Sequence, residues 1–152
     1  MYASYSGLTT RRIMQTFLPY TSFQKSAECL DNKRLGKQRV EAMQILNVLH
    51  GKSKGWRHHP AIKMWKGYDK ALSHYLYCVI SEWIKRGYKN TIPIPRKNSR
   101  VEMPYFVGNR KFHRSHRSNL LRKDKTHYSQ FKWKVPDNLP YVWPRGNKYE
   151  YG

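Results

Sequence analysis

The sequence predicts a mainly α-helical protein, formed by one compact domain of about three helices with long irregular loops. Three observations support this fold class. The chain has 152 residues, the size of a single domain, and 39% of them are hydrophobic, enough for one modest core. Apolar residues recur at helical spacing in two long segments, and each segment ends at a glycine. Prolines interrupt much of the remaining chain, as is typical of loops.

The first long helix is expected to begin after Thr21 or Ser22, because either hydroxyl suits an N-terminal cap. It is expected to run to about His50, where Gly51 follows as its natural stop. Gly36 lies inside this helix and is the place where a bend is expected.

The second helix is expected to start at Pro60, because proline suits the first turn of a helix. It is expected to reach about Arg86 and to stop at Gly87, with a break near Gly67. From 90 to 104 the chain becomes basic and contains several prolines, which predicts a surface loop.

The last third of the chain has the weakest helical pattern. A short third helix is expected over 115–123, with Ser115 as its cap. Beyond this helix an aromatic tail is punctuated by Pro136, Pro140 and Pro144, and it is expected to be irregular.

The domain boundaries follow from the opening segment. Residues 1–13 are expected to form an N-terminal extension, and 14–152 a single domain. The opening lacks the apolar stretch of a secretory signal. Cys29 and Cys78 both lie inside helical patterns, so we expect reduced core thiols and a reducing compartment such as the cytoplasm.

The charge of the chain predicts a polyanionic partner. The chain has thirty Lys and Arg residues and nine Asp and Glu residues, which gives a formal net charge of +21. Such self-repulsion costs stability unless a polyanion neutralises it. The cations are interleaved with five Trp, twelve Tyr and five Phe, so they coat a folded body rather than a disordered tail. No apolar run approaches the length of a membrane span, which favours nucleic acid, and DNA in particular, over a membrane.

Polar residues interrupt the apolar face of the first expected helix. At 100° per residue, one face carries Phe23, Ala27, Leu30, Ile45, Val48 and Leu49. The same sector also carries Asp31, Arg34, Gln38 and Glu41. Three interpretations stay open: a satisfied internal cluster, a bend at Gly36 that turns the middle of the helix to solvent, or the lining of a concave active site.

The remaining polar clusters favour phosphate contacts over metal binding. His58 and His59, together with His113 and His116, lack the cysteine pairs or dense carboxylates of a metal site. We therefore predict neither a metal nor a cofactor. The basic stretch 110–119, with the expected cap at its centre, predicts phosphate contacts at a helix start.

Several motifs resemble one known family. They are the segments 14–19 (MQTFLP), 30–41 (LDNKRLGKQRVE), 59–60 (HP), 64–67 (MWKG), 115–123 (SHRSNLLRK) and 139–144 (LPYVWP). Together they resemble the phage and bacterial branch of the pyrimidine-dimer DNA glycosylases of the endonuclease V type. A more distant likeness to the dimer glycosylases themselves rests on Arg39-Val40, on 68–70 (YDK) and on 85–88 (KRGY).

The resemblance implies a mainly helical enzyme, acting in a prokaryotic or phage-infected cell as a monomer on damaged double-stranded DNA. Such enzymes kink the duplex and flip a nucleotide. An amine attacks the sugar C1′, expels the base and leaves a Schiff base, after which a carboxylate assists elimination and the strand is nicked. The expected function is therefore that of a glycosylase and abasic-site lyase for pyrimidine dimers or another altered pyrimidine.

The sequence departs from the family pattern at two places. The amine of those enzymes is the freed chain start, whereas the corresponding Met14 follows thirteen residues here. Three alternatives would supply the amine. Met14 is the true start of the chain, or the extension is removed, or Lys33 or Lys37 acts instead. The family's catalytic Glu aligns with Gly36. Asp31 and Glu41, the nearest acids that replace it, are both in the interrupted stripe.

The expected site residues fall into a catalytic and a DNA-binding group. For catalysis they are Met14, Asp31, Arg34, Gln38 and Glu41. For DNA binding they are Lys33, Lys37, Arg39, Arg114, His116, Arg117, Arg122 and Lys123. Trp56, Trp65 and Trp143 are each expected either in the core or stacked on a displaced base. Two alternatives remain: a non-catalytic nucleic-acid-binding protein of the nucleoid, packaging or ribosome, and an enzyme of this scaffold acting on hypermodified phage bases.

Overall fold

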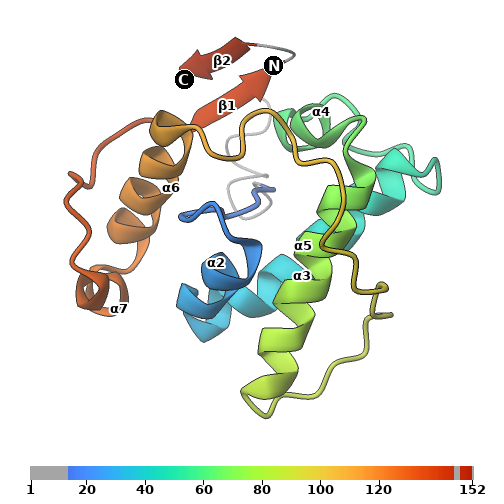
Figure 1. Ribbon diagram of the computed structural model, residues 1–152, viewed down its shortest axis with the longest axis horizontal. Helices are drawn as coiled ribbons and strands as arrows, with labels where there is room; N and C mark the ends of the chain where they lie inside the picture. The colour runs from blue at the N-terminus through green and yellow to red at the C-terminus, as the bar shows by residue number, and fades with distance from the viewer. Residues whose placement is uncertain (1–13, 146–147, 152) are drawn as a thin grey trace.

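Helices form most of the protein, which confirms the mainly α fold class (Figure 1). The computed structural model describes residues 14–145 and 148–151. Within these ranges the helices are α2 (Phe23–Cys29), α3 (Asn32–Leu49), α4 (Pro60–Trp65), α5 (Asp69–Lys85), α6 (Arg110–Lys123) and α7 (Lys125–Tyr128), followed by a 3₁₀ turn, η2 (Ser129–Phe131). The expected extension, 1–13, lies outside the described residues.

The first expected helix is two helices, because the chain breaks at Leu30 and not at Gly36. Ser22 caps α2 by accepting the Lys25 N–H at 3.1 Å, as the sequence predicts. Leu30 then adopts an extended conformation with its side chain fully buried, and Asp31 caps α3. The carboxylate cap explains the break, since it restarts the helix in a new direction.

Gly36 lies inside the uninterrupted α3 helix, so the chain does not break there. A Cβ atom at this position would lie 3.0 Å from Cη2 of Trp83 on α5. The glycine therefore allows α3 and α5 to pack closely. At the end of α3, Gly51 adopts a φ of +76°, which confirms the predicted stop.

The second expected helix is also divided, at the place the sequence predicts. Gly67, between α4 and α5, has a φ of +86°, a conformation that favours glycine. His59 caps α4 through Nδ1, which accepts the Ala61 N–H at 3.0 Å. Gly87 ends α5 with a φ of +94°.

The third helix begins earlier than expected, and the cap assigned to Ser115 is wrong. Asn109 caps α6 by accepting the Phe112 N–H at 3.0 Å. Ser115 is buried inside the helix, where its hydroxyl donates to the Phe112 carbonyl and accepts the Val142 N–H. The phosphate site expected at a helix start near Ser115 is therefore absent from that position.

The tail expected to be irregular ends in an antiparallel hairpin, β1 (Val142–Arg145) with β2 (Lys148–Tyr151). The Ser115 hydroxyl ties this hairpin to α6, a contact that local sequence patterns do not reveal. Across the described ranges, none of the helices has the length and apolar character needed to cross a bilayer.

The core lies between two groups of elements. One group is α2, α3 and α5, and the other is α6 with β1. The segment 14–19 runs between the two groups, near the centre of Figure 1. Its apolar side chains Met14, Phe17 and Leu18 are buried together with Trp65 of α4 and Tyr75 of α5. The N-terminal end of the described chain is thus enclosed by the rest of the domain.

Candidate active site

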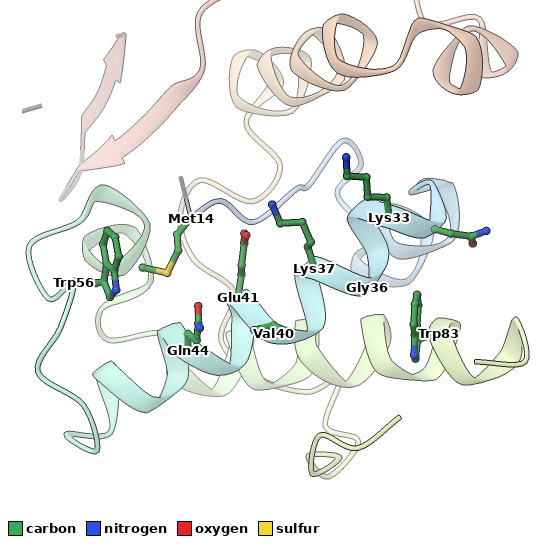
Figure 2. Close-up of a pocket in the computed structure, with 10 residues that line it drawn as sticks. Met14, Lys33, Gly36, Lys37, Val40, Glu41, Gln44, Trp56 and Trp83 are labelled. Atoms are coloured by element: carbon green, nitrogen blue, oxygen red, sulfur yellow. The ribbon is translucent and has the colours of Figure 1, made fainter. Parts of the chain in front are cut away.

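A pocket of about 540 Å³ lies along the exposed side of α3 (Figure 2). It is lined by Met14, Asn32, Lys33, Gly36, Lys37, Val40, Glu41, Gln44, Trp56 and Trp83. Most of these residues are three or four apart on α3, and this spacing places them on one face of the helix. Figure 2 shows Lys33, Lys37 and Glu41 pointing to the same side, with Met14 and Trp56 at one end and Trp83 at the other.

Glu41 is the carboxylate of this pocket. It is half-buried, and its Oε1 accepts the backbone N–H of Gln15 at 3.2 Å. The side-chain amide of Gln38, one turn earlier, lies 3.5 Å from the same oxygen. Burial raises the pKa of Glu41, against the opposing effects of the Gln15 N–H and of the charges on Lys37 and Lys123.

Asp31 lies in a different environment, at the start of α3. Its carboxylate caps the helix through the Arg34 N–H and forms an ion pair with the Arg34 guanidinium at 3.3 Å. It also accepts a hydrogen bond from the Tyr128 hydroxyl. Burial acts to raise the pKa of Asp31, but the Tyr128 hydrogen bond and the Arg34 charge outweigh it and lower the pKa.

The four polar residues of the interrupted stripe therefore separate into two pairs. Asp31 and Arg34 form an ion pair, and neither residue lines the pocket. Glu41 lines the pocket, and Gln38 is buried beside it with an exposed fraction of 1%. The structure thus combines two of the three interpretations, an internal ion pair at one end of the stripe and a pocket wall at the other.

Met14 brings the N-terminal segment to the pocket. Its side chain is 4% exposed and lines the same cavity as Glu41. The next backbone nitrogen, that of Gln15, is the one that contacts Glu41. Lys33 and Lys37 are exposed and line the pocket from α3, so all three expected sources of an amine border one cavity.

Lys123 brings a cation from α6 towards Glu41. Burial lowers the pKa of Lys123, and the positive charges of Arg34, Arg122 and Lys37 lower it further, while Glu41 opposes them. The charge of Lys123 in turn acts to lower the pKa of Glu41. Cations of α3 and α6, far apart in sequence, therefore act on the same carboxylate.

Several of the expected DNA-binding residues are engaged within the protein. Arg39 lies over the Trp83 ring at 4.4 Å and donates to the Asn90 side chain at 2.9 Å. Arg117 donates to the Pro19 carbonyl at 2.7 Å, and Arg122 to the Asp137 carbonyl at 2.6 Å. Arg122 remains exposed, Arg114 is half-buried, and Arg39 and Arg117 are partly covered.

The expectation that His116 contacts phosphate needs correction. Its ring is fully buried, and Nδ1 accepts the Leu18 N–H at 2.8 Å. A buried ring reaches no phosphate. Desolvation holds the pKa of His116 well below its usual range, which keeps the ring neutral and suits its role as an acceptor in the core.

The aromatic residues divide between core and pocket. Trp65 is fully buried, and Trp143 packs on Tyr141. Trp56 is half-exposed and lines the pocket, so it alone of the three expected tryptophans borders this cavity. Trp83, which was not among the expected site residues, lines the other end and stacks on Tyr88 at 4.3 Å. Periodicity does not reveal this role, because an apolar residue on a helix face is usually core.

Among the described residues, no group of three or more His, Cys, Asp or Glu side chains is placed to hold a metal ion. His58 and His59 belong to the loop before α4 and its cap, whereas His113 and His116 point into the core.

Comparison with known proteins assigns the chain to a family. A family model described as pyrimidine dimer DNA glycosylase matches residues 14–95, more than half of the chain. The chain therefore belongs to the pyrimidine dimer DNA glycosylase family, whose substrate class is DNA. Neither the curated proteins nor the solved structures contain a significant match. The matched range includes all ten residues of the pocket lining and ends before α6.

Proposed function

We propose that the protein is a DNA glycosylase with abasic-site lyase activity, acting in the α3 pocket on pyrimidine dimers or another altered pyrimidine in duplex DNA. One observation carries the proposal: Glu41 shares one pocket with Met14, Lys33 and Lys37, the three candidate sources of an amine, in a chain from this family. The backbone N–H that follows Met14, that of Gln15, donates to Glu41 at 3.2 Å. An amine and a carboxylate in one pocket are the two groups that Schiff-base chemistry followed by elimination requires.

Glu41 is the proposed catalytic carboxylate, in preference to Asp31. Its position on the pocket wall supports this role, as does its raised pKa, because a carboxyl that titrates closer to neutral pH exchanges protons more effectively. Asp31 is already committed to capping α3 and to pairing with Arg34.

The packing at Gly36 supports the same choice. The family's carboxylate aligns with this position in the sequence, but a side chain here would meet the Trp83 ring at 3.0 Å. Glu41 lies five residues further along α3 and lines the same pocket. We propose that the carboxylate function is carried by Glu41 in this chain.

The proposed nucleophile is the α-amine of Met14, which exists when Met14 begins the mature chain. Its lone pair would attack C1′, and the glycosidic C–N bond would break with its electrons going to the base, which takes up a proton from water as it leaves. One amine proton would pass to the ring oxygen as the C1′–O bond breaks, which leaves an iminium at C1′. A base, Glu41, would then remove a C2′ proton, and the C3′–O bond would break with the phosphate as the leaving group. Water would finally hydrolyse the imine and free the amine. Lys37 and Lys33 are the alternative amines, because both line the pocket.

The pocket has the dimensions and lining of a site for a displaced nucleotide. Its volume of about 540 Å³ lies within the range of small-ligand sites. Trp56, Val40 and Trp83 provide apolar and aromatic surface on which a base can stack. A lesion that is already poorly stacked costs less to displace, which favours damaged pyrimidines.

The proposed DNA-binding surface has two parts, one on each side of the pocket. Lys33 and Lys37 form the α3 part, and Arg114, Arg122 and Lys123 form the α6 part. Arg39 and Arg117 serve mainly to hold the fold, since each is partly covered and bonds within the protein, whereas Arg122 bonds within the protein but stays exposed.

Borohydride trapping on a duplex with one abasic site tests the proposal. The wild-type protein is expected to form a covalent adduct, and peptide mapping of that adduct identifies the amine as Met14, Lys33 or Lys37. The mature N-terminal residue, measured by mass spectrometry, shows whether the α-amine is available. If no adduct forms, the amine mechanism is wrong.

The two acids are separated by Glu41→Gln and Asp31→Asn. Glu41→Gln is expected to bind DNA normally and to lose cutting, whereas Asp31→Asn is expected to cut. Normal cutting by both variants would overturn the assignment. Comparing UV-irradiated, uracil-containing and base-modified duplexes identifies the lesion and tests the alternative of a hypermodified phage base.

A second candidate function is favoured by Gly36 itself. A family member without a side chain at the aligned carboxylate position fits a non-catalytic DNA-binding protein. Such a protein would bind intact and abasic duplexes equally and would give no trapped adduct, so the same experiment decides between the two.

A further inference from the structure

The segment 15–19 crosses the core without joining a helix or a sheet. Buried backbone N–H and C=O groups need hydrogen-bond partners, and these usually come from other backbone. Here side chains supply them. The pairs are Gln15 N with Glu41, Gln15 O with Gln38, Thr16 O with Tyr141, Phe17 N with Gln38, Phe17 O with Tyr75, Leu18 N with His116, Leu18 O with His113, and Pro19 O with Arg117.

These partners form two walls around the segment. Glu41, Gln38 and Tyr75 belong to α3 and α5, while His113, His116, Arg117 and Tyr141 belong to α6 and to the chain just before β1. The Gln15 N–H donates to Glu41, so this backbone nitrogen is held by the first wall.

Gln38 holds the segment as a neighbouring β-strand would. Its Nε2 donates to the Gln15 carbonyl at 2.8 Å, and its Oε1 accepts the Phe17 N–H at 3.1 Å. Residues two apart in an extended chain present these groups on the same side, so one amide satisfies both. The same Nε2 lies 3.5 Å from Glu41 Oε1 and thus links the segment to the carboxylate.

Tyr75 determines which way the Gln38 amide faces. Its hydroxyl donates to Gln38 Oε1 and lies 3.0 Å from the Phe17 carbonyl, with its single hydrogen shared between the two acceptors. The same hydroxyl oxygen accepts the Phe17 N–H at 3.2 Å and shares this donor with Gln38 Oε1. An amide turned the other way would place its NH₂ group against the Phe17 N–H. Both side chains are buried, with exposed fractions of 1% and 0%, so water cannot replace these contacts.

We propose that Gln38, braced by Tyr75, is a positioning residue that fixes the backbone of residues 15–17 against Glu41 and so determines where the chain-start amine meets the carboxylate. The proposal rests on the proposed function for its catalytic consequence. Misplacing a reacting group by about 1 Å costs on the order of 100-fold in rate. The Gln38 amide and the Tyr75 hydroxyl hold residues 15 and 17 on the Glu41 side, because no backbone ladder holds the segment.

Two variants at Gln38 test the proposal. Gln38→Met keeps the volume but removes all the hydrogen bonds of the amide, and it is expected to lower the single-turnover rate of adduct formation roughly 10- to 100-fold at saturating DNA. The dissociation constant for DNA is expected to change less than about twofold. Gln38→Glu keeps the acceptor for Phe17 and loses the donor to Gln15. Protonation restores a donor, so the ratio of its rate to the wild-type rate is expected to rise as the pH falls.

Tyr141→Phe is the matched comparison. It removes a buried tyrosine hydroxyl that bonds the same segment, at the Thr16 carbonyl, but from the opposite wall. We expect a comparable loss of thermal stability with a rate within about threefold of wild type. Tyr75→Phe, which removes the brace, is expected to resemble Gln38→Met instead, and it provides the test if Gln38→Met does not fold.

A second measurement does not depend on activity. NMR titration of the Glu41 side-chain carboxyl is expected to show a higher pKa in Gln38→Met than in wild type, because the Gln15 N–H that stabilises the charged form is displaced. An unchanged titration with an unchanged rate would overturn the positioning role, as would equal rate losses in Gln38→Met and Tyr141→Phe. If the wild-type protein gives no adduct, the proposed function fails, and the titration alone still decides whether Gln38 positions the segment.

Discussion

Asp31, the cap of α3, and Glu41, within α3, carry the same functional group, and their surroundings move their pKa values in opposite directions. Tyr128 and Arg34 stabilise the charged form of Asp31. Burial at the pocket wall destabilises the charged form of Glu41. Residue identity alone does not distinguish these two acids, because the difference comes from groups that are up to 97 positions away in the sequence.

The Asp31 environment predicts a pH-dependent contribution to stability. Asp31→Asn keeps a capping acceptor but removes the charge, so we expect it to lower the free energy of unfolding by roughly 1–2 kcal/mol at pH 7. The folded pKa is below the unfolded value. The contribution is therefore present above the unfolded pKa of about 4 and is lost as the pH falls through the folded value.

Urea unfolding of wild type and Asp31→Asn between about pH 3 and pH 7 checks this prediction. The difference between the two proteins should shrink steadily towards the acid end. A difference that stays constant over this range would show that the pKa of Asp31 is not lowered in the folded protein.

At the scale of the elements, the pair α3 and α5 is held close by Gly36. Glycine inside a helix usually costs about 1 kcal/mol relative to alanine, so Gly36→Ala would ordinarily stabilise the protein. Here the added Cβ meets Trp83, which is itself fixed by Arg39 on its face. We expect Gly36→Ala to be destabilising, by about 1–3 kcal/mol.

A double-mutant cycle with Trp83→Phe measures this contact, since a phenyl ring lacks the atoms that approach position 36. In the Trp83→Phe background, Gly36→Ala should regain the ordinary stabilising effect of alanine. A stabilising Gly36→Ala in the wild-type background would contradict the close packing.

At the scale of the whole molecule, the position of the cations matters as much as the net charge of +21. Cations from α3 and α6 act on one carboxylate at the pocket, so DNA that bridges the two helices would pass over Glu41. With five proposed phosphate contacts, the logarithm of the DNA-binding constant should fall with the logarithm of salt concentration with a slope of about −4 to −5.

Lys123→Ala is expected to reduce this slope by about 1 and to weaken binding to all sequences alike. Lys85→Ala is the matched control, because Lys85 lines a separate hollow between α2, α5 and the chain near Lys97. Fluorescence anisotropy at several salt concentrations gives both slopes. Equal slopes for Lys123→Ala and wild type would show that Lys123 makes no phosphate contact.

The parts of the fold that sequence predicts are those with local causes. Ser22 caps α2, Gly51 ends α3, and Gly67 separates α4 from α5, because each acts through its own backbone or that of near neighbours. The errors arise where distant contacts decide. Ser115 has the chemistry of a cap, yet it is buried against β1, which follows 27 residues later.

The sequence by itself determined the mainly helical class, the polyanionic partner and the polar interruption of α3, since periodicity, charge and caps are local or summed properties. Tertiary structure alone decided that Glu41 lies in the pocket while Asp31 caps a helix, and that His116 belongs to the core. The physical reason is that burial and hydrogen bonding depend on the neighbours that folding supplies. Segment 15–19 shows this most directly, because its backbone partners come from four separate parts of the chain.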